Sequence, residues 1–326
     1  MRLRALSSLM IVGGALIALA ACQPAKPTSP PGAQLAWAYP KGPKAPLPPY
    51  PAGELHVPGS KVTYTGEALN NGAGPPDWFP ESHPPAPQSV AKGGKDVLGC
   101  AECHRIGGDG YIGTADLAGL KADYIVQQVQ EFRAGRRRSW EANRPANEEM
   151  INVARKVSDA DLQAAADYYA ALPRKAHIRV IEGDTAPTVH GSFFGWMEVT
   201  PGQPARPLNG QVVEIAEDWS RMLLADPNSP VVIHAPVGTL ASGEALVRSG
   251  GPGGQACGSC HGPAMKGSTI APPLAGRSAA YLARQLLDIK TGARSGPAVG
   301  QMLSPTRELS DEQIRDISVY LASLAP

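Results

Sequence analysis

Two short segments of this chain combine residue types that can do chemistry together. Residues 100–104 read Cys-Ala-Glu-Cys-His and residues 257–261 read Cys-Gly-Ser-Cys-His, and Cys-x-x-Cys-His is the attachment signature of c-type haem. On a helix, positions i, i+3 and i+4 share one face. Two sulfurs can therefore reach the vinyl groups of one porphyrin while the imidazole reaches its iron. The sequence predicts two covalently bound haem c groups.

Other chemistries of paired cysteines fit these segments less well. A zinc site would need a second Cys or His pair close to each segment, and the sequence has none there. A thioredoxin-like redox pair would lie in a strand–helix unit, and it does not need a histidine directly after the second cysteine. Plain disulfides remain the alternative, and the repetition of all three residues favours haem.

The two segments belong to a longer repeat. Residues 157 positions apart match around the motifs, and after a five-residue difference the offset becomes 152 through the last predicted helix. Two offsets that hold over whole domains indicate a duplicated domain. The matched pairs include Cys100 with Cys257, Tyr124 with Tyr281, Gln128 with Gln285, Gly135 with Gly292, Met150 with Met302, Ser158 with Ser310, Asp159 with Asp311, Tyr168 with Tyr320 and Leu172 with Leu324.

Helical periodicity predicts how each copy is built. In the first copy we expect helices over 89–98, 122–134 and 158–172, with Gly94 allowing a close helix crossing. In the second copy we expect helices from about 241, over 280–290 and over 310–324, the last with a capping box that begins at Ser310. The predicted fold class is mainly α, with two tandem domains at 89–173 and 241–326.

The segment between the two copies, 174–240, has a residue pattern typical of strands rather than helices. Runs of β-branched and aromatic residues at 177–181, 193–199, 212–215 and 231–235 are separated by Pro/Gly turns. We expect a small β-rich insertion that packs on the first haem domain and has no evident chemistry of its own.

The N-terminus has the features of an export signal. Arg2 and Arg4 precede an apolar stretch, 9–21, which is too short to span a bilayer comfortably and suits a secretory signal. The stretch ends in Leu-Ala-Ala-Cys, which resembles a bacterial lipobox, so residues 1–21 are expected to be removed and Cys22 to be lipidated. Gln23 after the cysteine favours, by the same resemblance, the outer membrane. An ordinary signal cleaved after an Ala-x-Ala-like site is the alternative.

Residues 22–88 are predicted to form a Pro-rich tether or arm. Residues 23–90 hold 17 of the chain's 33 prolines, so the part up to residue 51 is expected to be an extended spacer without a core of its own. Trp37, Tyr39, Trp78 and Phe79 are too apolar for a pure spacer. Part of 52–88 is therefore expected to lie over a folded domain.

A six-coordinate haem needs a second axial ligand, and methionine or histidine is usual. Met150 and Met302 are the candidates, because they occupy equivalent positions eight residues before the serine that opens each last helix. Met265 lies four residues from a motif histidine and is expected to be a packing residue. The remaining histidines are expected to be surface or hydrogen-bonded residues, at positions 56, 83, 177, 190 and 234.

With these residues in view, each half resembles a class I c-type cytochrome, and the whole is similar to the two-domain, di-haem c-type cytochromes of bacterial periplasms. The resemblance covers 89–172 and 241–326. It implies a helical fold wrapped on each haem and one-electron transfer without bond chemistry. It further implies thioethers from Cys100, Cys103, Cys257 and Cys260, proximal ligands His104 and His261, and distal ligands Met150 and Met302.

The resemblance also points to two departures. In that family a proline carbonyl accepts a hydrogen bond from the proximal imidazole. Pro272 fits in the second half, whereas the first half has Ala115 in the corresponding segment. A backbone carbonyl can still serve there, but the hydrogen-bonded surroundings of the first haem's ligand are expected to be looser. The basic run at 136–138 is either a solvated loop or a patch that faces haem propionates or an acidic partner.

These features predict a periplasmic, membrane-tethered electron carrier rather than an enzyme. The expected partners are redox proteins (a periplasmic dehydrogenase, a terminal oxidase or another cytochrome) and the membrane, through the lipid anchor. The alternatives are a cytochrome subunit of a dehydrogenase complex and a di-haem peroxidase. A peroxidase needs an open iron position, against which two methionine candidates argue. The formal charge of +1 gives no electrostatic basis for binding nucleic acid.

Overall fold

The computed structural model describes residues 30–42, 48–71, 74–192 and 195–326. The predicted signal, Cys22 and Gln23 lie outside these residues, as does the start of the strand expected at 193–199. The chain divides into two units, Met1–Pro30 and Pro31–Pro326, and everything below concerns the second. In the described part of the chain, no helix combines the length and the apolar character that crossing a membrane requires.

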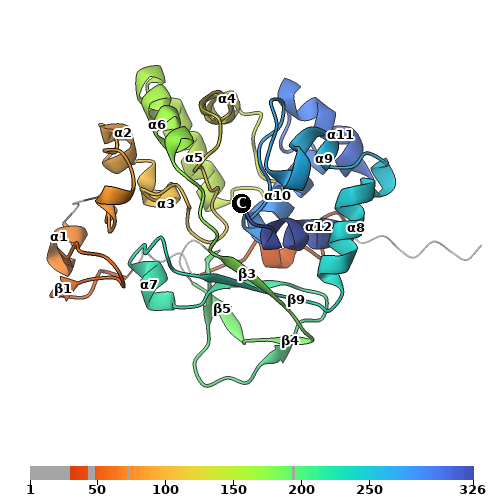
Figure 1. The fold of residues 1–326 in the computed structure, drawn as a ribbon, viewed down its shortest axis with the longest axis horizontal. Coiled ribbons are helices and arrows are strands. Elements are labelled where there is room, and N and C mark those ends of the chain that lie inside the picture. Colours follow the sequence, from red (N-terminus) through yellow and green to blue (C-terminus); the bar gives the residue numbers. More distant parts are fainter. Residues whose placement is uncertain (1–29, 43–47, 72–73, 193–194) are drawn as a thin grey trace, which may run out of the picture. The chain divides into compact units, whose positions relative to one another are not determined.

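The first copy of the repeat folds as five helices around the first Cys-x-x-Cys-His segment (Figure 1). The helices expected over 122–134 and 158–172 are confirmed to within one residue. Ser158 caps the second of these, because its side chain accepts a hydrogen bond from the Asp161 N–H. The helices are α2 (Gln88–Ala91), α3 (Ala101–His104), α4 (Ala122–Arg133), α5 (Pro145–Lys156) and α6 (Asp159–Ala171).

The helix expected over 89–98 is wrong beyond Ala91. Gly93 has a φ of +73°, a left-handed conformation that ends the helix. Gly94 and Val97 then pair in an antiparallel bridge. A Cβ built on Gly94 would have no neighbour within 4 Å, so this glycine does not serve a helix crossing. The helix α5, which carries Met150, was not predicted.

The second copy repeats this arrangement with a longer opening helix. The capping box on the last helix is confirmed, because Ser310 and Gln313 exchange side-chain to backbone hydrogen bonds. Gly243 lies where α8 crosses α12, and a Cβ there would sit 2.2 Å from the Asp316 carbonyl oxygen. The elements are α8 (Thr239–Ser249), η4 (Gly251–Gly253), α9 (Gly258–His261), η5 (Pro263–Met265), α10 (Ala279–Lys290), η6 (Pro297–Val299), α11 (Gly300–Arg307) and α12 (Asp311–Ser323).

The β-rich insertion is confirmed, but it packs on both copies. In its three-stranded sheet, the central strand pairs parallel with β3 and antiparallel with β8. One apolar cluster joins Ile233 to Ala279 and Val319 of the second copy, and another joins Met222 to Tyr111 of the first. The strands are β3 (Ile178–Glu182), β8 (Val213–Ala216) and β9 (Val231–Ala235), with the pairs β4 (Thr185–Ala186)–β7 (Arg206–Pro207) and β5 (Val189–Gly191)–β6 (Met197–Val199), and the helix α7 (Trp219–Leu223).

The prediction of a spacer without a core is wrong for residues 31–41, which we call the strap. Leu35, Ala38 and Tyr39 are buried in the core cluster of the second copy, around η1 (Ala36–Ala38). The N–H groups of Gly32 and Gln34 donate to the carboxylate of Asp311 in the first turn of α12, at 2.9 and 3.0 Å. Burial of a leucine and a tyrosine stabilises the docked strap over an extended one.

The rest of the arm packs a small apolar cluster against Leu224 of the insertion, in line with the expectation that part of the arm lies over a folded domain. Trp78 is almost fully buried, and its indole N–H donates to the Leu224 carbonyl beyond the C-terminus of α7 at 2.6 Å. Leu55, Val57 and Leu69 pack around it. The elements are β1 (Glu54–Leu55), β2 (Tyr64–Thr65), α1 (Gly66–Asn70) and η2 (Pro80–Ser82), the two strands forming an antiparallel hairpin.

Candidate haem sites and the junction between them

The histidines of the two Cys-x-x-Cys-His segments stand at the ends of two equivalent short helices. Cys100 and Cys257 begin α3 and α9, so each Cys-x-x-Cys-His segment occupies one helical turn. His104 Nδ1 donates to the Ala115 carbonyl and His261 Nδ1 donates to the Pro272 carbonyl, both at 2.8 Å. The carbonyl expected at Pro272 is therefore present. The looser support expected at Ala115 is wrong, because a backbone oxygen takes the same place whatever its side chain.

Each hydrogen bond fixes which ring nitrogen remains for a metal. With Nδ1 protonated, Nε2 is the bare nitrogen of a neutral imidazole, the form that ligates iron. The Nε2 of His261 is buried and has no hydrogen-bond partner. Burial lowers the pKa of both imidazoles, in His104 and in His261, and so favours the neutral form. A buried ring nitrogen without a partner fits an axial ligand of haem iron.

The four motif cysteines are free thiols, so the disulfide alternative is not realised in the described residues. Burial raises the pKa of Cys100 and of Cys103 to about 11, because an apolar surrounding disfavours the thiolate. No group of three or more His, Cys, Asp or Glu side chains that could hold a metal ion occurs among the residues described. Two thiols that form no disulfide, placed beside each histidine, fit haem attachment better than a zinc site.

The candidate distal ligands lie on equivalent helices. Met150 is in α5, half-buried against Val129, Phe132 and Ile151, and Met302 is half-buried in α11. Their ligation of iron stays a prediction. Met265 is buried in the core of the second copy, as expected of a packing residue.

The remaining histidines are placed mainly by hydrogen bonds. His83 joins the arm to α6, because its Nε2 lies 3.0 Å from Asp77 Oδ1 and its Nδ1 lies 3.2 Å from the Tyr168 hydroxyl. His190 Nδ1 lies 3.1 Å from Thr200 Oγ1 within the insertion. Such contacts are those of structural residues.

The two copies meet through a set of residues of which the sequence had singled out only the basic run at 136–138. Arg137 and Arg294 pair in an antiparallel bridge, in which the Arg138 N–H donates to the Ala293 carbonyl at 2.9 Å and the Ser295 N–H to the Arg136 carbonyl at 2.7 Å. Arg136 and Arg138 are exposed, as a solvated loop would be, but Arg137 is buried. The available signal was the offset of 157, which relates Arg137 to Arg294.

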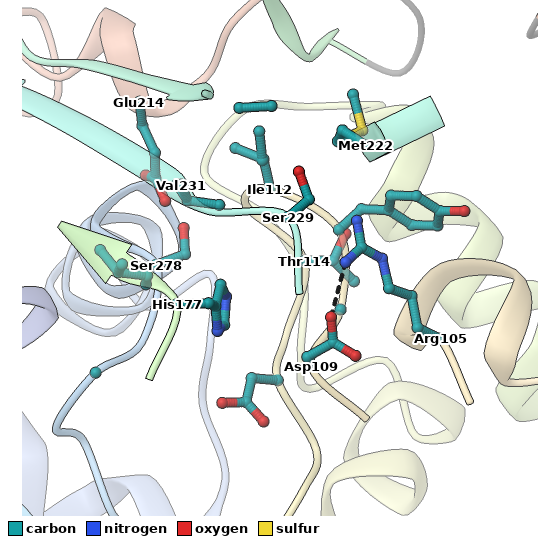
Figure 2. Close-up of a pocket in the computed structure, with 16 residues that line it drawn as sticks. Arg105, Asp109, Ile112, Thr114, His177, Glu214, Met222, Ser229, Val231 and Ser278 are labelled. Atoms are coloured by element: carbon teal, nitrogen blue, oxygen red, sulfur yellow. Dashed lines mark hydrogen bonds and ion pairs between the residues drawn. The ribbon is translucent and has the colours of Figure 1, made fainter. Parts of the chain in front are cut away.

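A small polar cavity lies where the 105–116 loop, the insertion and the second copy meet (Figure 2). Figure 2 shows the Arg105–Asp109 ion pair on one side, at 2.7 Å, and Glu214 on the other. Glu214 accepts a hydrogen bond from the Ala280 N–H near the start of α10, and its second carboxylate oxygen is unpartnered. A volume of about 20 Å³ suits a single water molecule rather than an organic substrate.

Comparison with known proteins agrees with this geometry. The cytochrome c family profile matches residues 90–172 and 243–325. A thiosulfate dehydrogenase electron acceptor from Thiomonas intermedia is 27% identical over 241 residues, which cover 73% of this chain and 84% of that protein. A cytochrome c4 from Thiocapsa roseopersicina is 28% identical over 233 residues, covering 69% and 87%.

A solved structure shows the same likeness. The thiosulfate dehydrogenase TsdBA from Marichromatium purpuratum superposes with a TM-score of 0.50 at 25% identity, over 73% of this chain. The present chain spans only 39% of the length of that protein.

Two helical copies, each with free thiols and a carbonyl-oriented histidine on one turn, define a two-domain haem protein. The chain belongs to the cytochrome c family. Its two domains imply two covalently bound haem c groups, and its function is electron transfer as a di-haem class I cytochrome.

Proposed function

We propose that each domain holds its haem through one equivalent set of side chains. In the first domain, Cys100 and Cys103 form the thioethers and His104 and Met150 are the axial ligands. In the second domain the same roles fall to Cys257, Cys260, His261 and Met302. The observation that carries this assignment is the matched pair of 2.8 Å hydrogen bonds from His104 and His261 to backbone carbonyls, because it leaves one bare ring nitrogen in each domain.

The proposed mechanism is one-electron relay. Each haem, when bound, supplies an iron centre that gains and loses one electron. The protein's part is to hold each imidazole in its neutral tautomer, to surround the thiols with apolar side chains and to keep the two domains in fixed contact. Because His/Met ligation leaves no open iron position, we infer a carrier rather than a peroxidase.

The partner of the carrier is proposed to be a redox enzyme. Relatives are named electron acceptors of thiosulfate dehydrogenase, and the TsdBA structure bears the name of that enzyme. This favours a role beside a periplasmic dehydrogenase, as its electron acceptor or as a subunit of its complex, over a role as an independent shuttle to a terminal oxidase.

The proposed location is the periplasm of a Gram-negative bacterium. The support is the signal-like N-terminus and the Leu-Ala-Ala-Cys sequence that ends at Cys22, since covalent haem attachment requires export. Lipidation of Cys22 would hold the protein at a membrane, the outer one being favoured by Gln23. Mass spectrometry of the exported protein tests this, because an unmodified mature N-terminus would contradict lipidation.

Anaerobic redox titration followed by visible spectroscopy tests the electron-transfer proposal. We expect two haem masses per chain and two one-electron steps, with spectra of His/Met-ligated iron at both sites. Chains matured with haem that carry fewer than two haem masses would contradict the assignment. Peroxide that oxidises the reduced protein at a catalytic rate would favour the peroxidase instead.

A further inference from the structure

The junction between the domains is a reciprocal hydrogen-bond network. Arg137 donates to Gln128 of its own domain at 3.1 Å, and to the Tyr281 hydroxyl and Gln285 of the other domain, both at 3.1 Å. Arg294 does the mirror image: it donates to Gln285 at 2.9 Å, to the Tyr124 hydroxyl at 3.2 Å and to Gln128 at 2.9 Å. Each domain therefore receives a guanidinium from its neighbour.

The charge of this network is not balanced by the protein. Arg137 and Arg294 are only 8% and 9% exposed, and within the described residues neither forms an ion pair with a carboxylate. All their side-chain hydrogen bonds there go to neutral amide and hydroxyl groups. Asp288 is near, but it is engaged by the Trp140 N–H at 2.7 Å and the Tyr39 hydroxyl at 3.5 Å.

One donor in the network is left over. The Nε–H of Arg294 is buried and has no partner. Burying two cations without an anionic partner destabilises the fold, and a buried donor without an acceptor destabilises it further. An arrangement of this kind is stable when an anion with carboxylate geometry completes it, because a guanidinium binds a carboxylate through paired hydrogen bonds.

The network reaches both haem sites. Tyr124 packs on the core cluster that includes Cys100 and Ala101, and Tyr281 packs on the cluster that includes Cys257. Each guanidinium is thus linked, through a tyrosine of the neighbouring domain, to the apolar cluster on which that domain's attachment segment packs.

We propose that Arg137 and Arg294 together bind two propionate carboxylates, one from each haem. Each arginine contacts the propionate of the neighbouring domain's haem as well as that of its own domain's haem. This inference rests on the proposed function, since it requires both haems. The pair then acts as a shared counter-ion. A nearby cation favours the more reduced, less positive iron. Loss of either arginine should therefore lower the reduction potential of both haems.

The test is a redox titration of Arg137→Gln in the haem-loaded protein, with Arg136→Gln as the matched control. Arg136 carries the same charge one residue away, but its side chain is 46% exposed and ion-paired with Glu131. Arg137→Gln should lower the reduction equilibrium constants of both haems by about tenfold, the order expected for a charge several ångströms away in a partly buried site. Arg294→Gln should do the same, and Arg137→Lys should restore most of the loss.

Two results would overturn the proposal. One is an Arg137→Gln protein with two haem masses whose potentials equal those of Arg136→Gln. The other is a crystal structure of the wild-type holoprotein with no propionate oxygen within hydrogen-bond distance of either guanidinium, a test that holds even where the variants do not fold. In both cases two haems would still be bound, so the proposed function would stand. A chain matured with haem that carries none would instead remove the proposed function.

Discussion

The two cytochrome domains agree in the residues that would handle haem and differ in the residues that support them. Both motif histidines, His104 and His261, donate to a carbonyl at 2.8 Å. Both junction arginines reach a tyrosine and a glutamine of the other domain. By contrast, only the second domain has the tight α8–α12 crossing at Gly243 and the strap in its core. Duplication has kept the contacts that chemistry requires, while the packing behind them has diverged.

The largest expected effect comes from removing one haem attachment. Cys100→Ala combined with Cys103→Ala should reduce the bound haem from two groups to one, because no thioether can form in the first domain. Intact-mass measurement of the matured protein would show the loss of one haem mass. The matched variant, Cys257→Ala with Cys260→Ala, should lose the other. A double-cysteine variant that keeps both masses would show that the two sites are not equivalent in attachment.

Exchange of one distal ligand should separate the domains. Met150→His should lower one reduction potential by ~100 mV or more, within the range of about 0.8 V that axial ligands span, and leave the other nearly unchanged. Histidine stabilises ferric iron more than a thioether does. Met302→His should affect the other haem, and anaerobic titration would measure both. If both potentials stayed in place in either variant, that methionine would not be a ligand.

Gly94 and Gly243, which lie near the start of the first and the second domain, should differ in their tolerance of a methyl group. Gly243→Ala should destabilise the protein by about 1–3 kcal/mol, because its Cβ overlaps backbone at the helix crossing. Gly94→Ala should be close to neutral, since nothing lies within 4 Å. Chemical denaturation of both variants would measure this. Equal stabilities would mean that α8 can move away from α12 without cost.

The smallest effect should appear in how two equivalent carboxyl groups, one in each domain, change the free energy of unfolding with pH. Glu131 and Asp288 are 157 residues apart, yet their pKa values shift in opposite directions. The Arg136 hydrogen bond lowers the pKa of Glu131, whereas burial raises that of Asp288. Ionised Glu131 thus stabilises the folded protein above the pKa of a glutamate in the unfolded chain. This stabilisation is lost as pH falls through the lower pKa of Glu131 in the folded protein. Ionised Asp288 instead costs stability as pH rises through its raised folded pKa.

Denaturation of two variants between pH 3 and 7 checks this contrast. Glu131→Gln should be less stable than wild type at pH 7 and should converge with it in acid, by a small amount because Arg136 is half-exposed and solvent screens the pair. For Asp288→Asn, the stability relative to wild type should improve as pH rises. Parallel pH profiles for the two variants would contradict the assigned directions.

The sequence predicted the features that depend on the spacing of neighbouring residues. The duplicated domain was confirmed by the two matches to the cytochrome c family. The capped helices α6 and α12 follow from residue spacing and were confirmed to within one residue. It did not predict α5, nor the early end of α2, where a left-handed Gly93 overrides the helical pattern. Helix ends of this kind depend on a single residue's conformation, which composition does not reveal.

The sequence failed mainly to predict contacts between residues that are far apart in the chain. Proline content suggested that the N-terminal arm is a spacer. Leu35 and Tyr39 instead pack in the core of the second copy, where Tyr39 contacts Asp288, 249 residues further along the chain. The basic run at 136–138 gave no sign that its middle residue is buried, because only contact with the other domain makes it so. Each of these features depends on a partner surface that the two copies create only when they are assembled.

The strap has a consequence for the order of events in biosynthesis. Gly32 is held by Asp311, 279 positions later in the chain, in α12, which is translated after both Cys-x-x-Cys-His segments. The segment that leaves the ribosome early must therefore wait, undocked, until the C-terminal helix is made. By then both thiol pairs have already been synthesised, so cofactor insertion can precede the closure of the N-terminal segment over the finished second domain.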